Sequence, residues 1–231
     1  MNFLNLLADL FSLLFPNLCC ACARHLHKGE SGICSTCIFQ IPYTDHHLHA
    51  DNKVARKFWG RIPLHTAIAL LYFKKGGSVQ SIIHHLKYKG RQEAGTVLGK
   101  LMADQLKKTP DYGKIDLVIA VPLHESKFRS RGYNQSHCIA AALASELGVP
   151  LNKDALIRVV ATESQTRKGR YKRHENMRAA FQIIAAEALH GKHVLLVDDV
   201  ITTGATLEAC AEILYKNGVR EVSIAVGACA D

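Results

Sequence analysis

The chain has 231 residues, of which 48% are hydrophobic and 21% are charged. This balance excludes a disordered or fibrous chain and allows one large domain, or one domain with a small appendage, around a sizeable core. A formal net charge of +9 favours a polyanionic partner, either nucleic acid or a phosphorylated small molecule, without distinguishing between them.

The first sixteen residues are apolar, with Leu4, Leu7, Phe11 and Leu14 at helical spacing. The stretch before Asp9 lacks the basic start and the small-residue cleavage site of a secretory signal, and it is too short and interrupted to span a bilayer. We expect an amphipathic helix that packs on the chain's own core or on a partner, with peripheral membrane contact as the alternative. A cytoplasmic location follows from this interpretation.

Two Cys-x-x-Cys pairs, separated by eleven residues, follow this segment: Cys19 with Cys22, and Cys34 with Cys37. Two such pairs close a tetrahedral site with four thiolates. We therefore predict a structural Zn²⁺, which would supply folding energy to a segment too small to bury a core. A disulfide pair and free thiols are the other interpretations. The competing ligands nearby are Cys20, His25 and His27.

Residues 41–63 show no clear periodicity, and we expect a linker there. The predicted division is an N-terminal helix with a four-cysteine zinc-binding module (residues 1–50) and a second domain (residues 51–231). A histidine cluster in this stretch resembles a metal site, but in a polar linker solvated side chains are the favoured interpretation. Its members are His46, His47 and His49.

Residues 67–73 are β-prone, and two amphipathic helices follow them. The predicted buried positions are Val79, Ile82, Ile83 and Leu86 in the first helix, and Val97, Leu98, Leu101 and Met102 in the second. Between the helices, residues 87–91 read Lys-Tyr-Lys-Gly-Arg. Residue type alone favours a solvated helix end, whose cations meet the negative end of the helix dipole.

The rest of the chain alternates short apolar runs with helical patterns. Residues 116–121 and 194–197 are predicted to be buried strands, and further strands are expected at residues 156–161 and 221–226. This alternation is typical of an α/β domain with a mainly parallel sheet flanked by helices. A cationic loop containing Arg129 and Arg131 follows the strand at residues 116–121, which places an anion site at its C-terminal end.

The stretch 194–206 reads VLLVDDVITTGAT and contains the acid pair Asp198 and Asp199. The hydroxyl-rich turn after the strand opens a helix, whose free backbone N–H groups bind a phosphate monoester well. The predicted phosphate-binding residues are Thr202, Thr203, Gly204, Ala205 and Thr206. Because the acid pair would repel this phosphate, its expected partners are hydroxyls and a divalent cation. A ribose with a 5′-phosphate and a Mg²⁺-bound pyrophosphate meets both requirements.

All thirteen positions of residues 194–206 resemble the phosphoribosyl pyrophosphate (PRPP) loop of type I phosphoribosyltransferases. The chain as a whole resembles the ComF family of competence-associated proteins. The further residues that carry the resemblance are the two Cys-x-x-Cys pairs, residues 87–90, 121–123 and 131–135, Ser164, Gln165, Arg173, Asn176, Ala180 and Phe181. The family implies a zinc-binding module on a type I phosphoribosyltransferase-like fold and a link with DNA uptake in natural transformation.

A basic segment lies ahead of the PRPP loop and contains Arg167, Arg170 and Arg173. Residue type alone favours a solvated segment. Its position favours instead a lid that closes over the pyrophosphate and shields it from water.

Two functions are consistent with these features. The first is a PRPP-binding phosphoribosyltransferase-like protein in which Asp198 and Asp199 are the catalytic pair, Arg129 and Arg131 bind the pyrophosphate, and Mg²⁺ accompanies it. The alternative is a single-stranded DNA-binding competence protein without transferase turnover, acting with other DNA-uptake proteins. In that alternative, the bases would stack on Tyr133 or Tyr171. No base-selecting hood is evident, so no acceptor is named.

Overall fold

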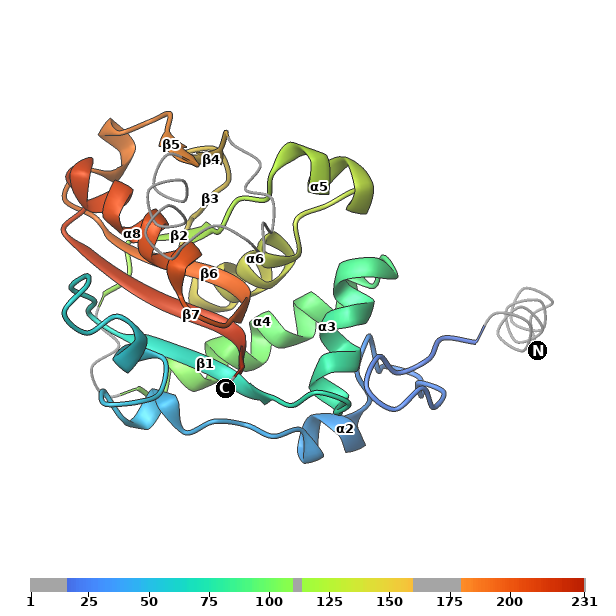
Figure 1. Cartoon of the computed structure of the whole chain (residues 1–231). Coiled ribbons are helices and arrows are strands. Elements are labelled where there is room, and N and C mark those ends of the chain that lie inside the picture. Colours follow the sequence, from blue (N-terminus) through green and yellow to red (C-terminus); the bar gives the residue numbers. More distant parts are fainter. Residues whose placement is uncertain (1–15, 110–113, 160–179, 231) are drawn as a thin grey trace, which may run out of the picture.

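The computed structural model describes residues 16–109, 114–159 and 180–230. Five strands form a parallel sheet in the order β1-β7-β6-β2-β3 (Figure 1). They are Ala67–Phe73 (β1), Leu117–Ala120 (β2), Leu151–Asn152 (β3), His193–Ile201 (β6) and Glu221–Ala230 (β7). The predicted parallel sheet is confirmed, whereas the predicted N-terminal helix and the basic segment at residues 163–178 lie outside the described residues.

Helices cover both faces of this sheet, because successive side chains along a strand point to opposite faces. Leu195 and Val197 pack with α3, α4 and α6, whereas Val194 and Leu196 pack with α8 (Figure 1). The helices are Ser78–Tyr88 (α3), Gln92–Leu106 (α4), Gln135–Leu147 (α6) and Ala205–Lys216 (α8). The result is a three-layer α/β arrangement with one apolar core on each side of the sheet.

The predicted strand at residues 156–161 does not join the main sheet. Residues Leu156–Arg158 (β4) pair antiparallel with Phe181–Ile183 (β5) in a separate two-stranded ribbon. The physical reason is a turn after β3, in which the Asn152 side chain accepts hydrogen bonds from the N–H groups of Asp154 and Ala155. This turn directs the chain away from the edge of the parallel sheet.

The predicted cationic loop after β2 contains a short helix, Glu125–Arg131 (α5). The His124 side chain caps its N-terminus by accepting a hydrogen bond from the N–H of Ser126, and Gly132 ends it at φ 79°. None of the residues of α5 is buried. The helix therefore lacks the apolar periodicity by which a sequence pattern identifies a helix.

The predicted linker at residues 41–63 is packed against the sheet. Val54 and Phe58 are buried, and the Asn52 side chain donates a hydrogen bond of 2.9 Å to the carbonyl of Ala67 in β1. His46 is only 3% exposed, and burial lowers its pKa, so the prediction of a solvated side chain is wrong for this residue. His49, with 60% of its side chain exposed, is solvated. Two 3₁₀ helices, His46–Leu48 and Ala55–Lys57, fold the segment locally.

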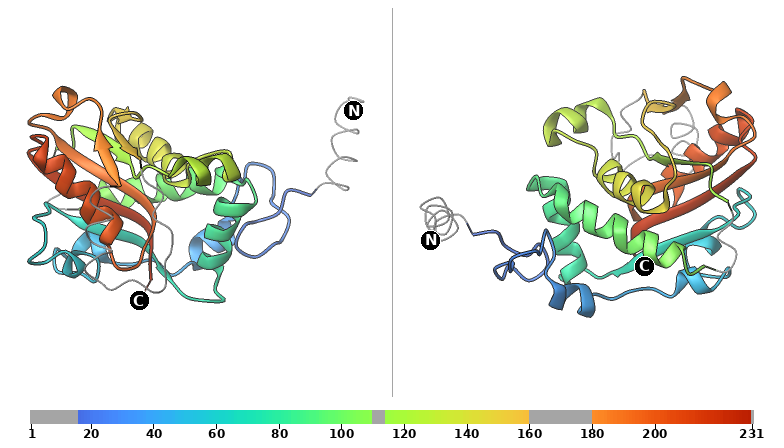
Figure 2. Two further views of the ribbon diagram at one scale, coloured as in Figure 1. Left: turned by 45° about the horizontal axis from the view of Figure 1, so that its top comes forward. Right: turned by 180° about the vertical axis from the view of Figure 1, so that it is seen from behind.

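The four-cysteine segment packs against α3 and α4 (Figure 2). The Ser81 hydroxyl donates a hydrogen bond of 2.7 Å to the carbonyl of Cys20, and Arg91 donates one of 3.1 Å to the carbonyl of Leu18. The division into residues 1–50 and 51–231 stays a prediction. Within the three described ranges, none of the helices has the length and apolarity that a bilayer crossing requires.

Candidate functional site at the carboxyl ends of β2 and β6

The strand order reverses between β2 and β6. These strands are parallel neighbours, but the chain continues from β2 through α6 to β3 on one side and from β6 through α8 to β7 on the other. Open α/β sheets bind ligands in the crevice at the carboxyl ends of such strands. Ser136, at the start of α6, and Asp198, near the end of β6, meet there: the serine hydroxyl donates a hydrogen bond of 2.7 Å to Asp198 Oδ1.

Two residues ahead of Ser136 in the chain, Tyr133 and Asn134, position it. Asn134 accepts a hydrogen bond from the N–H of Ser136 at 3.0 Å and so caps α6, while its amide donates to the carbonyl of Val121 at 2.9 Å. The Tyr133 hydroxyl donates a hydrogen bond to the carbonyl of Leu86 in α3. The loop after β2 is therefore held on both sides, and Ser136 lies at a fixed place beside the acid pair.

The acid pair is poorly exposed to water. Asp199 is 7% exposed, and its N–H donates a hydrogen bond of 2.8 Å to Asp198 Oδ1. Burial and the neighbouring charge of Asp199 raise the pKa of Asp198 to about 7. Asp198 can therefore lose or gain a proton near neutral pH when a ligand changes the local charge.

A lysine from α3 neutralises the second carboxylate. Lys87 Nζ lies 2.9 Å from Asp199 Oδ1, and the lysine side chain is 23% exposed. The interpretation of a solvated helix end is therefore wrong for Lys87, although it holds for the exposed Lys89. Gly90, at φ +69°, turns the chain directly after this helix. Residue type alone gave no signal for this contact, because the partners are distant in sequence.

Further cations gather next to the pair. Arg131 lies with its guanidinium 5.1 Å from the Tyr88 ring centroid and donates a hydrogen bond of 2.7 Å to Gln135. Partial desolvation lowers the pKa of Lys127, and the charges of Arg158, Arg131 and Lys87 lower it further. Lys127, Arg158 and Ser136 interact with the acid pair and were not among the predicted site residues.

The structure separates the predicted arginines. Arg129 pairs with Glu125 on the outer side of α5, and 75% of its side chain is exposed. It therefore points to solvent, whereas Arg131 contacts α3 and α6. The three predicted lid residues, Arg167, Arg170 and Arg173, lie outside the described residues.

The predicted phosphate loop follows β6 directly. Thr202 and Thr203 are exposed, and Gly204 is the N-cap of α8 at φ +81° without a side-chain cap. Ala205 and Thr206 form the first positions of the helix. The N–H of Ala205 donates a long hydrogen bond of 3.5 Å to the Thr203 hydroxyl, and the N–H of Glu208 donates one of 2.9 Å to the carbonyl of Gly204. The N–H groups of Thr206 and Leu207 lie between these two donors, have no intrahelical acceptor and remain available to an anion.

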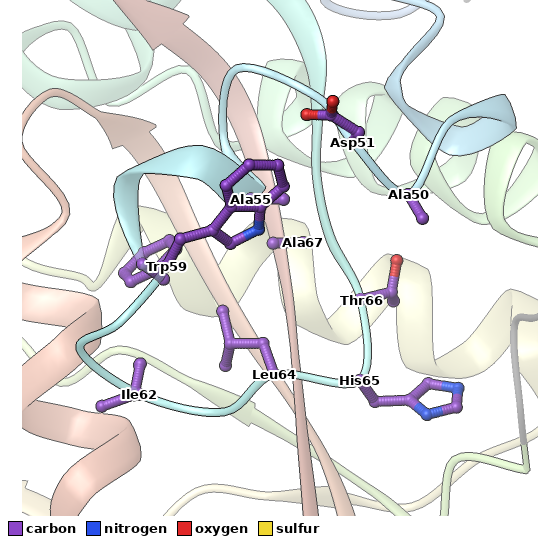
Figure 3. A pocket seen from close by; sticks show the side chains of 10 residues that line it. Ala50, Asp51, Ala55, Trp59, Ile62, Leu64, His65, Thr66 and Ala67 are labelled. Carbon is purple, nitrogen blue, oxygen red and sulfur yellow. The ribbon is translucent and has the colours of Figure 1, made fainter.

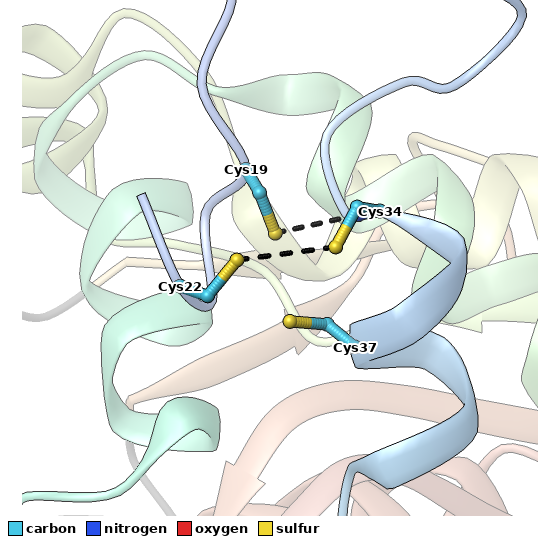
Figure 4. A group of neighbouring side chains, drawn as sticks. All are labelled: Cys19, Cys22, Cys34 and Cys37. Atoms are coloured by element: carbon cyan, nitrogen blue, oxygen red, sulfur yellow. Dashed lines mark hydrogen bonds between the residues drawn. The ribbon is translucent and has the colours of Figure 1, made fainter. Parts of the chain in front are cut away.

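The predicted cysteine ligands converge on one point (Figure 4). The Sγ atoms of Cys19, Cys22, Cys34 and Cys37 all lie within 4.8 Å of one another. Cys22 and Cys34 have their sulfurs 3.9 Å apart, too far for a disulfide, and all four thiols are free. Hydrogen bonds from Arg24 lower the pKa of Cys22 to about 6. These four side chains are positioned to bind a metal ion.

A cavity of about 330 Å³ lies within residues 50–67 (Figure 3). Its walls are mostly apolar and include Phe58, Trp59 and Leu64, with His65 and Asp51 among the polar residues. None of the predicted site residues lines it. The acid pair and this cavity are therefore separate features of the described chain.

Comparison with known proteins gives three findings. A family profile described as "Phosphoribosyl transferase domain" matches residues 134–228, which include the acid pair and the predicted phosphate loop. The chain is 29% identical over 224 residues to the DNA utilization protein YhgH of Escherichia coli O157:H7, covering 92% of this chain and 96% of that protein. It is 27% identical over 222 residues to competence protein F of Haemophilus influenzae, and the match covers 89% of this chain and 94% of that protein.

Among solved structures, the glutamine PRPP amidotransferase of Bacillus subtilis, complexed with ADP and GMP, aligns with 62% of this chain and 30% of its own. The identity is 21% and the TM-score is 0.44. The family match at residues 134–228 confirms the predicted type I phosphoribosyltransferase-like fold class.

Proposed function

With the resemblance to the ComF family confirmed by relatives that match most of the chain, we propose that this phosphoribosyltransferase-like protein binds PRPP at the carboxyl ends of β2 and β6. The observation that carries the proposal is the acid pair. Asp198 contacts the Ser136 hydroxyl and Asp199 the Lys87 ammonium, and the chain continues from them into a helix N-terminus whose first N–H groups lack intrahelical acceptors. An anionic sugar with hydroxyls matches this arrangement of charge.

Each part of PRPP has a counterpart in this arrangement. The 5′-phosphate binds to the N–H groups and hydroxyls of residues 202–206, and the ribose hydroxyls donate hydrogen bonds to Asp198 and Asp199. Lys87, Lys127 and Arg131 take the pyrophosphate, because they supply positive charge near the acid pair. The lid role of Arg167, Arg170 and Arg173, which lie outside the described residues, stays a prediction from the sequence.

Mg²⁺ fits the donor set of the site. The two carboxylates of the pair are hard oxygen donors, and a pyrophosphate offers further oxygens of the same kind, which is the coordination that Mg²⁺ prefers. When bound, the ion neutralises negative charge on the leaving pyrophosphate. The acid pair in turn orients the ribose and stabilises the positive charge that develops at C1 as its bond to the pyrophosphate oxygen breaks. A nitrogen nucleophile completes the transfer, and its identity is open.

Zn²⁺ is the metal we propose for the four cysteines. A tetrahedral zinc with Zn–S bonds of about 2.3 Å places its sulfurs roughly 3.8 Å apart, and the Sγ atoms of Cys22 and Cys34 are 3.9 Å apart. Four protein ligands leave no open position, so the role is structural.

The names of the relatives support a link with DNA uptake, because one is a DNA utilization protein and the other a competence protein. Single-stranded DNA and other DNA-uptake proteins stay proposed partners. The alternative of DNA binding without turnover is not favoured: Tyr133 is partly buried with its hydroxyl bonded to Leu86, and Tyr171 lies outside the described residues. The cytoplasmic location and a peripheral membrane contact stay predictions.

Calorimetric titration of the zinc-loaded protein with PRPP and Mg²⁺ tests the central proposal. We expect saturable binding by the wild-type protein, and its loss when Asp198→Asn and Asp199→Asn are combined. A slow additional heat in the presence of a nitrogenous acceptor would reveal turnover. If the double variant binds PRPP and turns over as the wild type does, the assignment of the acid pair is wrong.

A further inference from the structure

A buried carboxylate lies in the first turn of α8, close to the proposed 5′-phosphate site. Glu208 is 3% exposed, and its N–H closes the first turn on the carbonyl of Gly204. Its negative charge opposes an anion at the N–H groups of the same turn, because like charges repel strongly where water is excluded. The phosphate site therefore requires a group that cancels this charge.

Arg61 supplies that group from the segment that follows the cysteine module. Its Nε donates a hydrogen bond of 3.0 Å to Glu208 Oε1, and its Nη2 donates to Oε2 of the same carboxylate. Its third contact, from Nη1 to the carbonyl of Lys57 at 2.9 Å, fixes the side chain against its own segment. This planar two-bond pairing is the geometry in which an arginine neutralises a carboxylate best.

The same turn of chain contacts the phosphate loop a second time, through Phe58. Phe58 is 1% exposed, and a Cβ placed on Gly204 would lie 3.0 Å from its Cε1 and Cζ atoms. The N–H of Arg61 donates to the carbonyl of Phe58 at 2.9 Å, so one turn presents both side chains. At the other end of α8, the Tyr215 hydroxyl donates to the carbonyl of Pro63 at 2.9 Å.

We infer that Arg61 and Phe58 are positioning residues for the 5′-phosphate loop, with Arg61 cancelling the charge of Glu208 and Phe58 supporting the backbone at Gly204. The inference rests on the proposed function, since it concerns how the same site accepts a phosphate. It also gives a role to residues 58–61, which the sequence pattern places in a linker.

Ribose 5-phosphate is the appropriate probe, because it carries the 5′-phosphate without the pyrophosphate. We expect Arg61→Met to weaken its binding about tenfold or more in calorimetry, since the buried Glu208 carboxylate then loses its arginine and its charge repels the phosphate. Adding Glu208→Gln to Arg61→Met should restore most of the affinity, because the repelling charge is gone. The matched control is Arg56→Met, which breaks the exposed pair with Asp51 on the same segment and should leave binding unchanged.

The outcomes separate this inference from the proposed function. Wild-type binding together with equal binding by Arg61→Met overturns the inference and leaves the PRPP site standing. If Arg61→Met does not fold, the variant that combines Arg61→Met with Glu208→Gln tests the electrostatic role of Arg61, because both charges of the pair are absent from it. A folded double variant that binds ribose 5-phosphate more than about tenfold more weakly than the wild type overturns the electrostatic role of Arg61. A wild-type protein that binds neither ribose 5-phosphate nor PRPP overturns both proposals.

Discussion

Lys87 Nζ lies 2.9 Å from Asp199 Oδ1, so the last turn of α3 brings a cation to the acid pair near the end of β6. The contact joins α3, which follows the edge strand β1, to β6, the strand in the middle of the sheet. It gives the Lys-Tyr-Lys-Gly turn a physical role, since the turn ends α3 where its lysine reaches the carboxylate. A bound pyrophosphate would offer the same ammonium a second anionic partner.

We predict that Lys87→Met weakens PRPP binding about 10- to 100-fold, because a hydrogen bond to a charged group is worth roughly 1.5–3 kcal/mol. The measurement is calorimetric titration with PRPP and Mg²⁺. Lys89→Met is the matched control, since this lysine lies two residues further on and is exposed. Equal affinities for the two variants would remove Lys87 from the site.

PRPP binding should release protons near neutral pH. Burial and Asp199 raise the pKa of Asp198 from 3.8 to about 7, so below that pH the free protein holds a proton on this carboxyl. A bound cation favours the carboxylate and expels the proton, so affinity should rise as the pH increases through about 7 and level off above it. Titrations in buffers of different ionisation enthalpy measure the released protons. Asp198→Asn should abolish the release, and an unchanged proton count in that variant would contradict the assignment.

The parallel sheet could be predicted from the sequence because its central strands are short, continuous apolar runs followed by helices. Residues 41–63 could not be placed, because Val54 and Phe58 are buried by contacts with the sheet and α8 that no local period reveals. The partners of the acid pair were equally hidden. Ser136 and Lys87 reach Asp198 and Asp199 from two other elements, and only the packing of α3 and α6 brings them together.

Gly204→Ala should damage the phosphate loop more than its backbone strain alone explains. A left-handed residue with a side chain costs about 1–2 kcal/mol, and at Gly204 the new Cβ also meets the Phe58 ring at 3.0 Å. Gly76→Ala is the matched control, with φ +79° and nothing within 4 Å of the added Cβ. Urea unfolding and ribose 5-phosphate titration of both variants measure the two effects. If Gly204→Ala were no less stable than Gly76→Ala, the Phe58 ring would have to move away from the new Cβ at no measurable cost in stability.

The two arginines of α5 should contribute unequally. Arg131 lies against Tyr88 and Gln135 beside the other cations of the site, whereas Arg129 pairs with Glu125 in solvent. We expect Arg131→Met to weaken PRPP binding about tenfold or more and Arg129→Met to change it less than about threefold, because exposed ion pairs contribute little. Inorganic pyrophosphate, titrated in parallel, identifies the affected part of the ligand. If Arg129→Met lost more PRPP affinity than Arg131→Met, helix α5 would have to rotate when PRPP binds.

Removing one cysteine ligand should release the metal and destabilise the whole chain. Cys34 and Cys37 belong to the same apolar core as α3 and α4, so loosening their loop exposes residues on which the main fold depends. We expect wild-type protein to hold one zinc per chain by elemental analysis, Cys37→Ser to hold none, and the melting temperature of that variant to fall by about 2–4 °C for each kcal/mol lost. Cys138→Ser is the control, because this cysteine lies outside the four-sulfur group. Retention of zinc and an unchanged melting temperature in Cys37→Ser would exclude this residue as a ligand.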